Sequence, residues 1–143
     1  MILVDLNVLL YAIDEDAPQH DAARGWFERE MSGDEPVGFA WIVLLGFLRL
    51  TTRAGILRRP LAPEDSTQYI DEWLAHPGAR AVAPTERHWP ILRGLLSHSG
   101  TAANLTGDAH LAALALEHGA SIASFDRDFR RFAGVRLIVP GVR

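Results

Sequence analysis

Residues 1–10 read MILVDLNVLL, in which one acid, Asp5, separates an apolar tetrapeptide from a second apolar run. The run Ile2–Val4 is too short for a helix and is typical of a buried strand, whereas Leu6–Ile13 has the apolar spacing of a helix. A carboxylate between two buried elements is costly unless it finds a partner. The stretch therefore predicts a strand–helix unit whose acid has its partners elsewhere in the chain.

The alternation of strands and helices continues along the rest of the sequence. Pro18 can begin a helix. Thr106 is a candidate N-cap for the late helix, and Gly119 is a candidate stop for it. The stretch Trp41–Arg53 is apolar nearly all round, which indicates a helix that is buried on most faces. Alternating strands and helices predict a three-layer α/β/α fold with a central, mostly parallel sheet, in a single domain over 1–143. We expect helices at Pro18–Met31, Trp41–Arg53, Pro63–Ala75, Thr85–Ser97 and 107–118, strands at 37–40, 79–84, 120–125 and 135–139, a loop at 99–107, and a turn or short helix at 126–132.

The composition excludes several classes of protein. With no cysteine, the chain has no disulfide, no thiolate metal site and no cysteine nucleophile. A net charge of −4 argues against a generally basic nucleic-acid coat. The longest apolar run is shorter than the ~20 residues that span a bilayer, and no basic segment precedes the apolar start as in a signal peptide. We expect a cytoplasmic protein without a membrane partner.

Four acids follow or precede the strands in a way that predicts a shared site. Asp5 and Asp126 each follow a strand, and the carboxyl ends of parallel strands lie at one edge of a sheet. Asp108 opens the helix that leads into the second of these strands, and Asp128 lies two residues beyond Asp126. Alone, Asp108 is typical of a helix N-terminus and Asp128 of a solvated turn, but converging carboxylates repel one another and need a cation. Hard oxygen ligands favour Mg²⁺, with Mn²⁺ as an alternative, and this is the chemistry of a metal-dependent nuclease or phosphatase.

Two stretches, ILVDLNVLLYA (2–12) and NLTGDAHLAALALEHGASIASFDRDF (104–129), resemble those of PIN-domain ribonucleases. The chain is most similar to the toxins of VapBC toxin–antitoxin modules, particularly the mycobacterial group. The resemblance implies a Mg²⁺-dependent endoribonuclease that cleaves structured RNA such as tRNA or rRNA loops. It matches Asp5, Asp108, Asp126 and Asp128 to the family's catalytic and metal-binding acids and Asn7 to a polar residue near them. It also implies a small VapB-like antitoxin as partner, an RNA substrate and a homodimer.

The sequence departs from the family pattern at Gly46. Many PIN domains carry a Glu in the helix after the second strand, and Gly46 takes that place, with no acid anywhere from Pro36 to Pro63. This departure puts a two-metal mechanism in doubt. It also leaves open an alternative, a catalytically weak or inactive PIN-like module that binds RNA or protein.

A second enzyme class, the phosphatases of the haloacid-dehalogenase type, is disfavoured. Such an enzyme would need an acid at the position of Asn7 and a downstream Lys, and the chain has no Lys.

Other signals are interpreted as structural. The six histidines do not form a ligand set, although His110 lies two residues after Asp108. The four tryptophans, Trp26, Trp41, Trp73 and Trp89, are interpreted as packing anchors because each falls on a helix with apolar neighbours.

Overall fold

The structure is a computed structural model that describes residues 1–100 and 102–142. Its strands lie in one sheet. All four pairings in this five-stranded sheet are parallel, with strand order β3-β2-β1-β4-β5. The strands are β1 (Ile2–Val4), β2 (Val37–Ala40), β3 (Ala79–Val82), β4 (Ser121–Ala123) and β5 (Leu137–Ile138). The parallel sheet predicted from the alternating pattern is confirmed.

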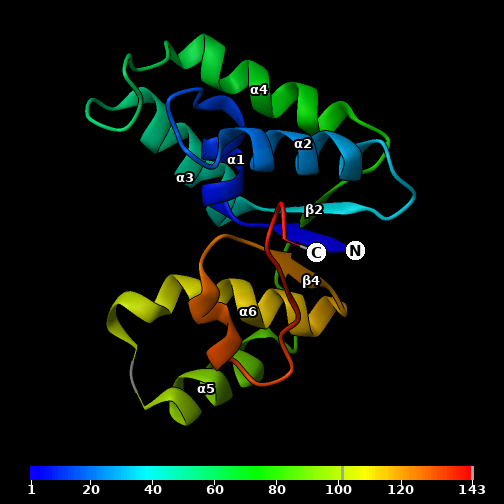
Figure 1. The fold of residues 1–143 in the computed structure, drawn as a ribbon. Helices are drawn as coiled ribbons and strands as arrows, with labels where there is room; N and C mark the ends of the chain where they lie inside the picture. The colour runs from blue at the N-terminus through cyan, green and yellow to red at the C-terminus, as the bar shows by residue number, and fades with distance from the viewer. Residues whose placement is uncertain (101, 143) are drawn as a thin grey trace.

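Helices cover the two faces of the sheet (Figure 1). The connections β1–β2 and β2–β3 carry the helices of one layer, and the connection β3–β4 carries those of the other. The first layer is α1 (Leu6–Ile13), α2 (His20–Met31), α3 (Trp41–Thr52) and α4 (Pro63–Ala75); the second is α5 (His88–Ser99) and α6 (Thr106–His118), with the short 3₁₀ helices η1 (Ala103–Leu105) and η2 (Arg127–Arg131). The expected α/β/α sandwich is thus confirmed.

The strand order explains how the two ends of the chain meet. β1 lies in the middle of the sheet between β2 and β4, and Val4 pairs with Ala123 in parallel register. Both residues are fully buried, as is Leu3. The first residue after β1 is Asp5, so it lies beside the residue that follows β4, which is Ser124.

Several helix ends differ from those expected. Leu105, not Thr106, precedes α6, because the preceding loop winds into η1 and draws Thr106 into the helix. Gly119 ends α6 in the left-handed conformation, as predicted. Thr85 does not begin α5, which starts at His88; its hydroxyl instead accepts a hydrogen bond from the Arg87 amide at 3.2 Å. Thr101, in the expected loop 99–107, lies outside the described residues.

Two interpretations of apolar residues were wrong. Trp26 and Trp73 are buried packing anchors as expected, but Trp41 and Trp89 are 50% and 62% exposed. Helix α3 also has an exposed apolar face, which includes Ile42 and Leu45 as well as Trp41. The sheet covers only one side of this helix, so the apolar character of its other side was not evidence of burial. No helix among the described residues is long and apolar enough to cross a membrane.

Candidate functional site

Asp5 is placed by the backbone at the junction of β1 and α1. Its amide donates to the Ala123 carbonyl at 2.9 Å, which extends the β1–β4 ladder by one bond. Its side chain caps α1, with Oδ1 accepting from the Leu6 amide at 2.8 Å. The carboxylate is therefore held at the carboxyl edge of the sheet with one oxygen committed to the helix and the other directed toward β4.

The second oxygen of Asp5 binds a residue that the sequence had not singled out. The buried Ser124 hydroxyl donates to Asp5 Oδ2 at 2.6 Å and accepts from Asn7 Nδ2 at 3.1 Å and from the Asp126 amide at 3.0 Å. Asn7 also accepts, through Oδ1, from the Phe125 amide at 3.2 Å. Asn7 thus lies beside the acids, as its match to the family implied. The one feature that could have identified Ser124 as a site residue is its place directly after β4, beside the junction of β1 and α1 that Asp5 occupies.

The charges of the other three predicted acids act on Asp108. Burial and the charges of Asp5, Asp126 and Asp128 raise the pKa of Asp108 to about 6, while the nearby guanidinium of Arg131 works in the opposite direction. Burial also raises the pKa of Asp5, with hydrogen bonds from Ser124 and Leu6 opposing this and the charge of Asp126 adding to it. The four predicted acids therefore share one region of negative potential, although they come from opposite ends of the chain.

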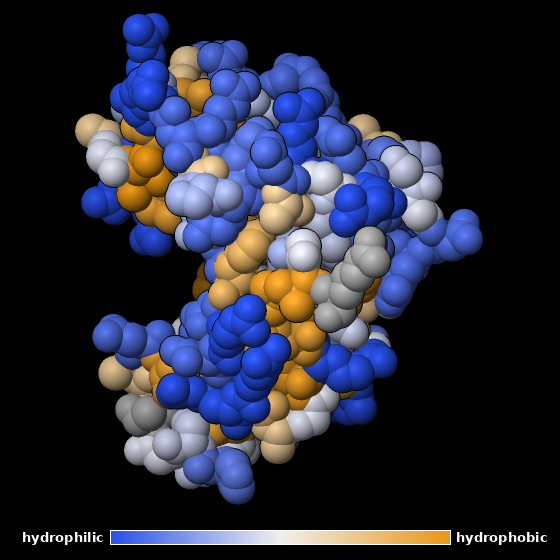
Figure 2. Space-filling view, viewed as in Figure 1, coloured by the Kyte–Doolittle hydropathy of each residue, from blue (hydrophilic) through white to orange (hydrophobic). Residues whose placement is uncertain are grey.

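A hollow lies at this edge of the sheet. Figure 1 shows the strand arrows running toward the side on which α3 and the start of α6 lie apart from each other. The space-filling view shows a deep notch on the same side, between the α1–α4 layer and the α5–α6 layer (Figure 2). Asp126 is the third residue after β4 and caps η2 by accepting from the Asp128 amide at 2.9 Å, which fixes the start of this short helix.

The chemistry of these side chains fits a hydrated divalent cation. Within the described part of the chain, no three His, Cys, Asp or Glu side chains are close enough together to enclose a metal ion by themselves. Mg²⁺ keeps several of its waters and is usually bound by one or two carboxylates together with substrate phosphates. Acids whose charges act together on Asp108 without enclosing a site suit that mode of binding. The expected ligand set of Asp5, Asp108, Asp126 and Asp128 stays a prediction.

Comparison with known proteins decides the family. A model of the PIN domain matches residues 2–135. "Ribonuclease VapC37" of Mycobacterium tuberculosis is 51% identical over 140 residues, which make up 98% of this chain and 97% of that protein. The chain is a PIN-domain protein of the VapC family.

Solved structures of VapC-type proteins share the fold. The VapBC2 structure from Rickettsia felis, described as bound to a DNA fragment from its promoter, superimposes with a TM-score of 0.72 at 17% identity and covers 96% of this chain and 98% of its own. Mycobacterium tuberculosis VapC20, described as a sarcin–ricin-loop cleaving toxin, superimposes with a TM-score of 0.67 at 20% identity, covering 95% of this chain and 99% of its own. At these identities the likeness shows a shared fold and nothing further.

Gly46, where many PIN domains carry a Glu, has a local packing partner. A Cβ atom added to Gly46 would lie 2.8 Å from Cδ2 of Leu6, the residue that follows Asp5. Gly46 is itself buried in α3. Leu6 therefore fills the space into which a side chain at position 46 would extend.

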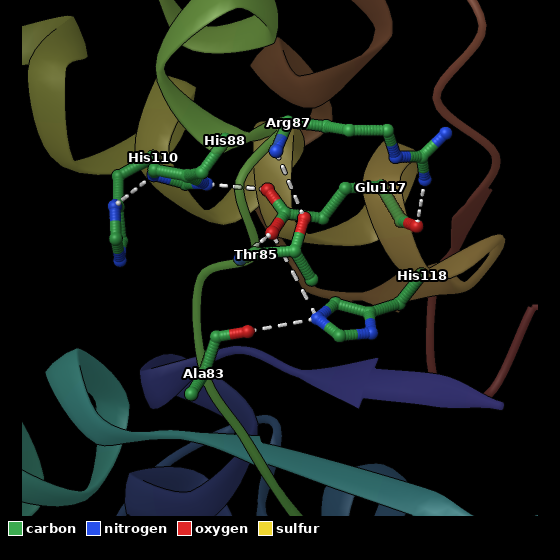
Figure 3. A network of polar contacts seen from close by, with 7 residues as sticks. All are labelled: Ala83, Thr85, Arg87, His88, His110, Glu117 and His118. Carbon is green, nitrogen blue, oxygen red and sulfur yellow. Dashed lines mark hydrogen bonds and ion pairs between the residues drawn. The ribbon is translucent and has the colours of Figure 1, made fainter.

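A second polar cluster of this PIN domain lies between α5 and α6, around Glu117 (Figure 3). The Glu117 side chain is 0% exposed; it accepts from the Thr85 amide at 2.5 Å and from His88 Nδ1 at 2.5 Å. The Arg87 guanidinium donates a hydrogen bond to the backbone carbonyl of Glu117. On the other side of the ring, His88 Nε2 shares a 2.9 Å hydrogen bond with Nδ1 of His110. This cluster was not predicted from the sequence, although the seven-residue spacing of His110 and Glu117 puts both on one helix face.

The Glu117 cluster fastens the start of α5 to α6 and is separate from the acids. Burial raises the pKa of Glu117, but the hydrogen bonds from Thr85 and His88 outweigh it, so the pKa lies below its ordinary value. Burial and the neighbouring His88 lower the pKa of His110. Because residues two apart on a helix point to opposite sides, His110 is directed toward α5 and Asp108 toward the other acids. The ring of His110 is thereby assigned to the structural cluster.

Proposed function

We propose that this chain is a Mg²⁺-dependent endoribonuclease and the toxin of a type II toxin–antitoxin module, acting in the cytoplasm. The observation that carries the proposal is the convergence of four acids at one edge of the sheet, where burial and the charges of Asp5, Asp126 and Asp128 raise the pKa of Asp108 to about 6. A bound cation would offset this repulsion. The 51% identity to a protein named as a ribonuclease supports RNA as the substrate.

The residues of the chain have separable tasks in this proposal. Asp5, Asp108, Asp126 and Asp128 would hold Mg²⁺, or Mn²⁺ in its place. When bound, the cation supplies a Lewis acid that stabilises charge on the phosphodiester and lowers the pKa of the attacking water. Ser124 and Asn7 orient Asp5, and the notch between the two helical layers admits the RNA. An exposed RNA loop suits such a notch, because loops present unstacked nucleotides that a protein can surround; tRNA and rRNA loops are the proposed substrates.

Partners follow from the relatives. Structures that share this fold are of VapBC complexes, including VapBC2 of Rickettsia felis, and we infer a small VapB-like antitoxin for this chain too. A homodimer is also proposed, with the exposed apolar face of α3, Trp41, Ile42 and Leu45, as its candidate surface. Contiguous exposed apolar side chains on a small protein mark sites of association.

The alternative function is an inactive PIN-like binding module, and Gly46 is the observation behind it. Since Mg²⁺ sites need only one or two protein carboxylates, a side chain at position 46 is not required for a hydrated ion. The filling of that space by Leu6 is a packing solution that leaves the four acids in place. We therefore favour the active enzyme.

The test is cleavage of total bacterial RNA by the purified chain in Mg²⁺ and in EDTA, with Asp5→Asn and Asp108→Asn as variants. We expect fragments with Mg²⁺ alone and a loss of at least about 100-fold in rate for each variant, as is usual when a group that stabilises the transition state is removed. Cleavage that survives EDTA or both substitutions would refute the metal-dependent mechanism. Mg²⁺ binding that is negligible and insensitive to Asp5→Asn, measured by calorimetry, would favour the inactive module.

A further inference from the structure

The short helix η2, which follows Asp126, has three distinct faces. A 3₁₀ helix has three residues per turn, so residues three apart lie above one another. One face carries Phe129 and the following Phe132, which are 0% and 3% exposed and anchor the helix to the core. A second carries Arg127 and Arg130, both exposed, and the third carries Asp128 and Arg131.

The third face is turned toward the acids. Arg131 Nη2 lies 4.0 Å from Asp128 Oδ1, and its positive charge also acts on Asp108, where it opposes the raised pKa. Within the described part of the chain, no other basic side chain forms an ion pair with any of the four acids. A cation in this position stands beside the place where the reacting phosphate must come.

The backbone at Arg131 is fixed, whereas its guanidinium is not fully used in hydrogen bonds. The Asp126 cap and the two buried phenylalanines fix the backbone around it. A committed Arg–carboxylate pair has N–O distances of about 2.7–2.9 Å, whereas this one is at 4.0 Å with the side chains of Arg131 and Asp128 44% and 66% exposed. The guanidinium therefore has donors available for another anion, and its planar fork matches the oxygens of a phosphate.

We propose that Arg131 binds a phosphate of the RNA backbone beside the acids, and that the charge of Asp128 keeps the uncommitted guanidinium near them. The inference rests on the proposed ribonuclease function and adds to it the residue that seats the substrate. It also explains why an exposed acid and an exposed arginine occupy one face of a helix whose other arginines have no such partner. Arg131 neutralises part of the repulsion between the acids and the incoming phosphodiester, so substrate affinity depends on it.

The experiment compares Arg131→Ala with Arg130→Ala, which removes the same charge from the same helix but from a face turned away from the acids. Binding of a fluorescently labelled oligouridylate is measured in EDTA, where metal-dependent cleavage is silent, over a series of salt concentrations. Each phosphate contact contributes about −0.7 to the slope of log K against log salt for a single strand. Arg131→Ala should weaken binding about tenfold and make the slope shallower by that amount. Arg130→Ala should leave the slope as it is, and Arg131→Lys should restore the slope more than the affinity.

Cleavage of total bacterial RNA with Mg²⁺ separates this inference from the proposed function. Arg131→Ala should raise the apparent KM by about the factor lost in binding, whereas Asp5→Asn should abolish turnover. If Arg131→Ala and Arg130→Ala behave alike in slope and in KM, the inference is wrong even though Asp5→Asn is inactive. If Asp5→Asn still cleaves while Arg131→Ala alone loses affinity, the metal site is wrong and the phosphate contact stands.

Discussion

The Ser124 hydroxyl donates a 2.6 Å hydrogen bond to Oδ2 of Asp5 across a sequence separation of 119 residues. This bond joins the ends of two neighbouring strands and gives the acid at the centre of the proposed site a fixed orientation. Because Ser124 is fully buried, the hydroxyl has no water to replace the carboxylate as its acceptor. The stability of the sheet edge and the orientation of Asp5 therefore depend on the same atom.

Ser124→Ala should reduce both stability and RNA cleavage. The variant removes the hydroxyl that binds Asp5 Oδ2, Asn7 Nδ2 and the Asp126 amide. Leaving such groups unpaired costs about 1–3 kcal/mol of the free energy of unfolding. Chemical denaturation in EDTA measures that loss, and cleavage at a temperature where the variant is folded measures the effect on Asp5. Ser121→Ala, three residues earlier at the start of β4, is the control. Full cleavage by a destabilised Ser124→Ala would show that the hydroxyl is structural alone.

Asp108→Asn should stabilise the metal-free protein at neutral pH. The pKa of Asp108 is raised from 3.8 to about 6, so between these values the folded protein binds more protons than the unfolded chain. The free energy of unfolding then falls as the pH rises from about 4 to 6 and stays low above it. Removing the charge should raise the melting temperature in EDTA at pH 7.5 by about 2–6 °C.

The control for Asp108 is Asp65, which holds the same third position in its helix, α4, but is exposed. Asp65→Asn loses a favourable interaction with the helix dipole, so its melting temperature should stay level or fall. Mg²⁺ should stabilise the unmodified protein according to its affinity and have less effect on Asp108→Asn. Equal melting temperatures for the two Asn variants would contradict the repulsion between the acids.

Residues around Asp5 show how far the sequence alone could lead. The bounds of β1 and α1 were predicted to the residue, because a three-residue apolar run, an acid and a helical repeat leave little choice. Asp126 was expected directly after a strand over 120–125, but β4 ends at Ala123. The rule that parallel strands end at one edge therefore brings Ser124 beside Asp5, with Asp126 two residues farther along the chain. Ser124 was missed because a serine bound to a distant carboxylate has the same local sequence as one facing water.

Exposure was the property that the sequence predicted least well. Trp41 and Trp89 have apolar neighbours on their helices, like the buried Trp26 and Trp73, yet they face outward. Which side of a helix meets the sheet is decided by packing between segments far apart in the chain. A helix that is apolar nearly all round, such as α3, has no polar stripe to mark its outer side. The start of α6 was misplaced for a related reason, since η1 extends the helical backbone ahead of Thr106.

Glu117→Ala should destabilise the protein in a pH-dependent way and spare the acidic site. The lowered pKa means that the ionised carboxylate is favoured in the folded state; its contribution is complete above the ordinary Glu pKa and is lost as the pH falls through the lower folded value. At pH 7 we expect a loss of about 2–4 kcal/mol, and a smaller gap to the unmodified protein near pH 3. The exposed Glu86 provides the matched substitution, Glu86→Ala.

The spatial separation of the Glu117 cluster from the acids gives a second readout. Stabilisation by Mg²⁺ should be retained in Glu117→Ala at a temperature where it is folded. If the Mg²⁺ response disappeared along with the stability, the cluster and the acids would be coupled rather than independent.

The stability gained from Gly46→Ala should be limited by a clash with Leu6. Alanine in a helix interior is favoured over glycine by about 1 kcal/mol, but the added methyl group would lie 2.8 Å from a terminal carbon of Leu6. Overlap of this kind costs about 1–3 kcal/mol, so the single variant should be no more stable than the unmodified protein. A double-mutant cycle with Leu6→Ala should show coupling of at least 0.5 kcal/mol, measured by denaturation. Additive effects would mean that Leu6 does not fill the space beside Gly46.

Leu45→Glu should weaken self-association. Leu45 is 58% exposed on the apolar face of α3, and burying a carboxylate in an interface without a partner is strongly unfavourable. Analytical ultracentrifugation across a range of concentrations should show a dimer for the unmodified chain and a shift toward monomer for the variant. Val142→Glu changes another side chain of the same exposure, 58%, near the other end of the chain, and should leave the dimer intact. If the two variants sediment alike, the face of α3 is not the surface through which copies of the chain associate.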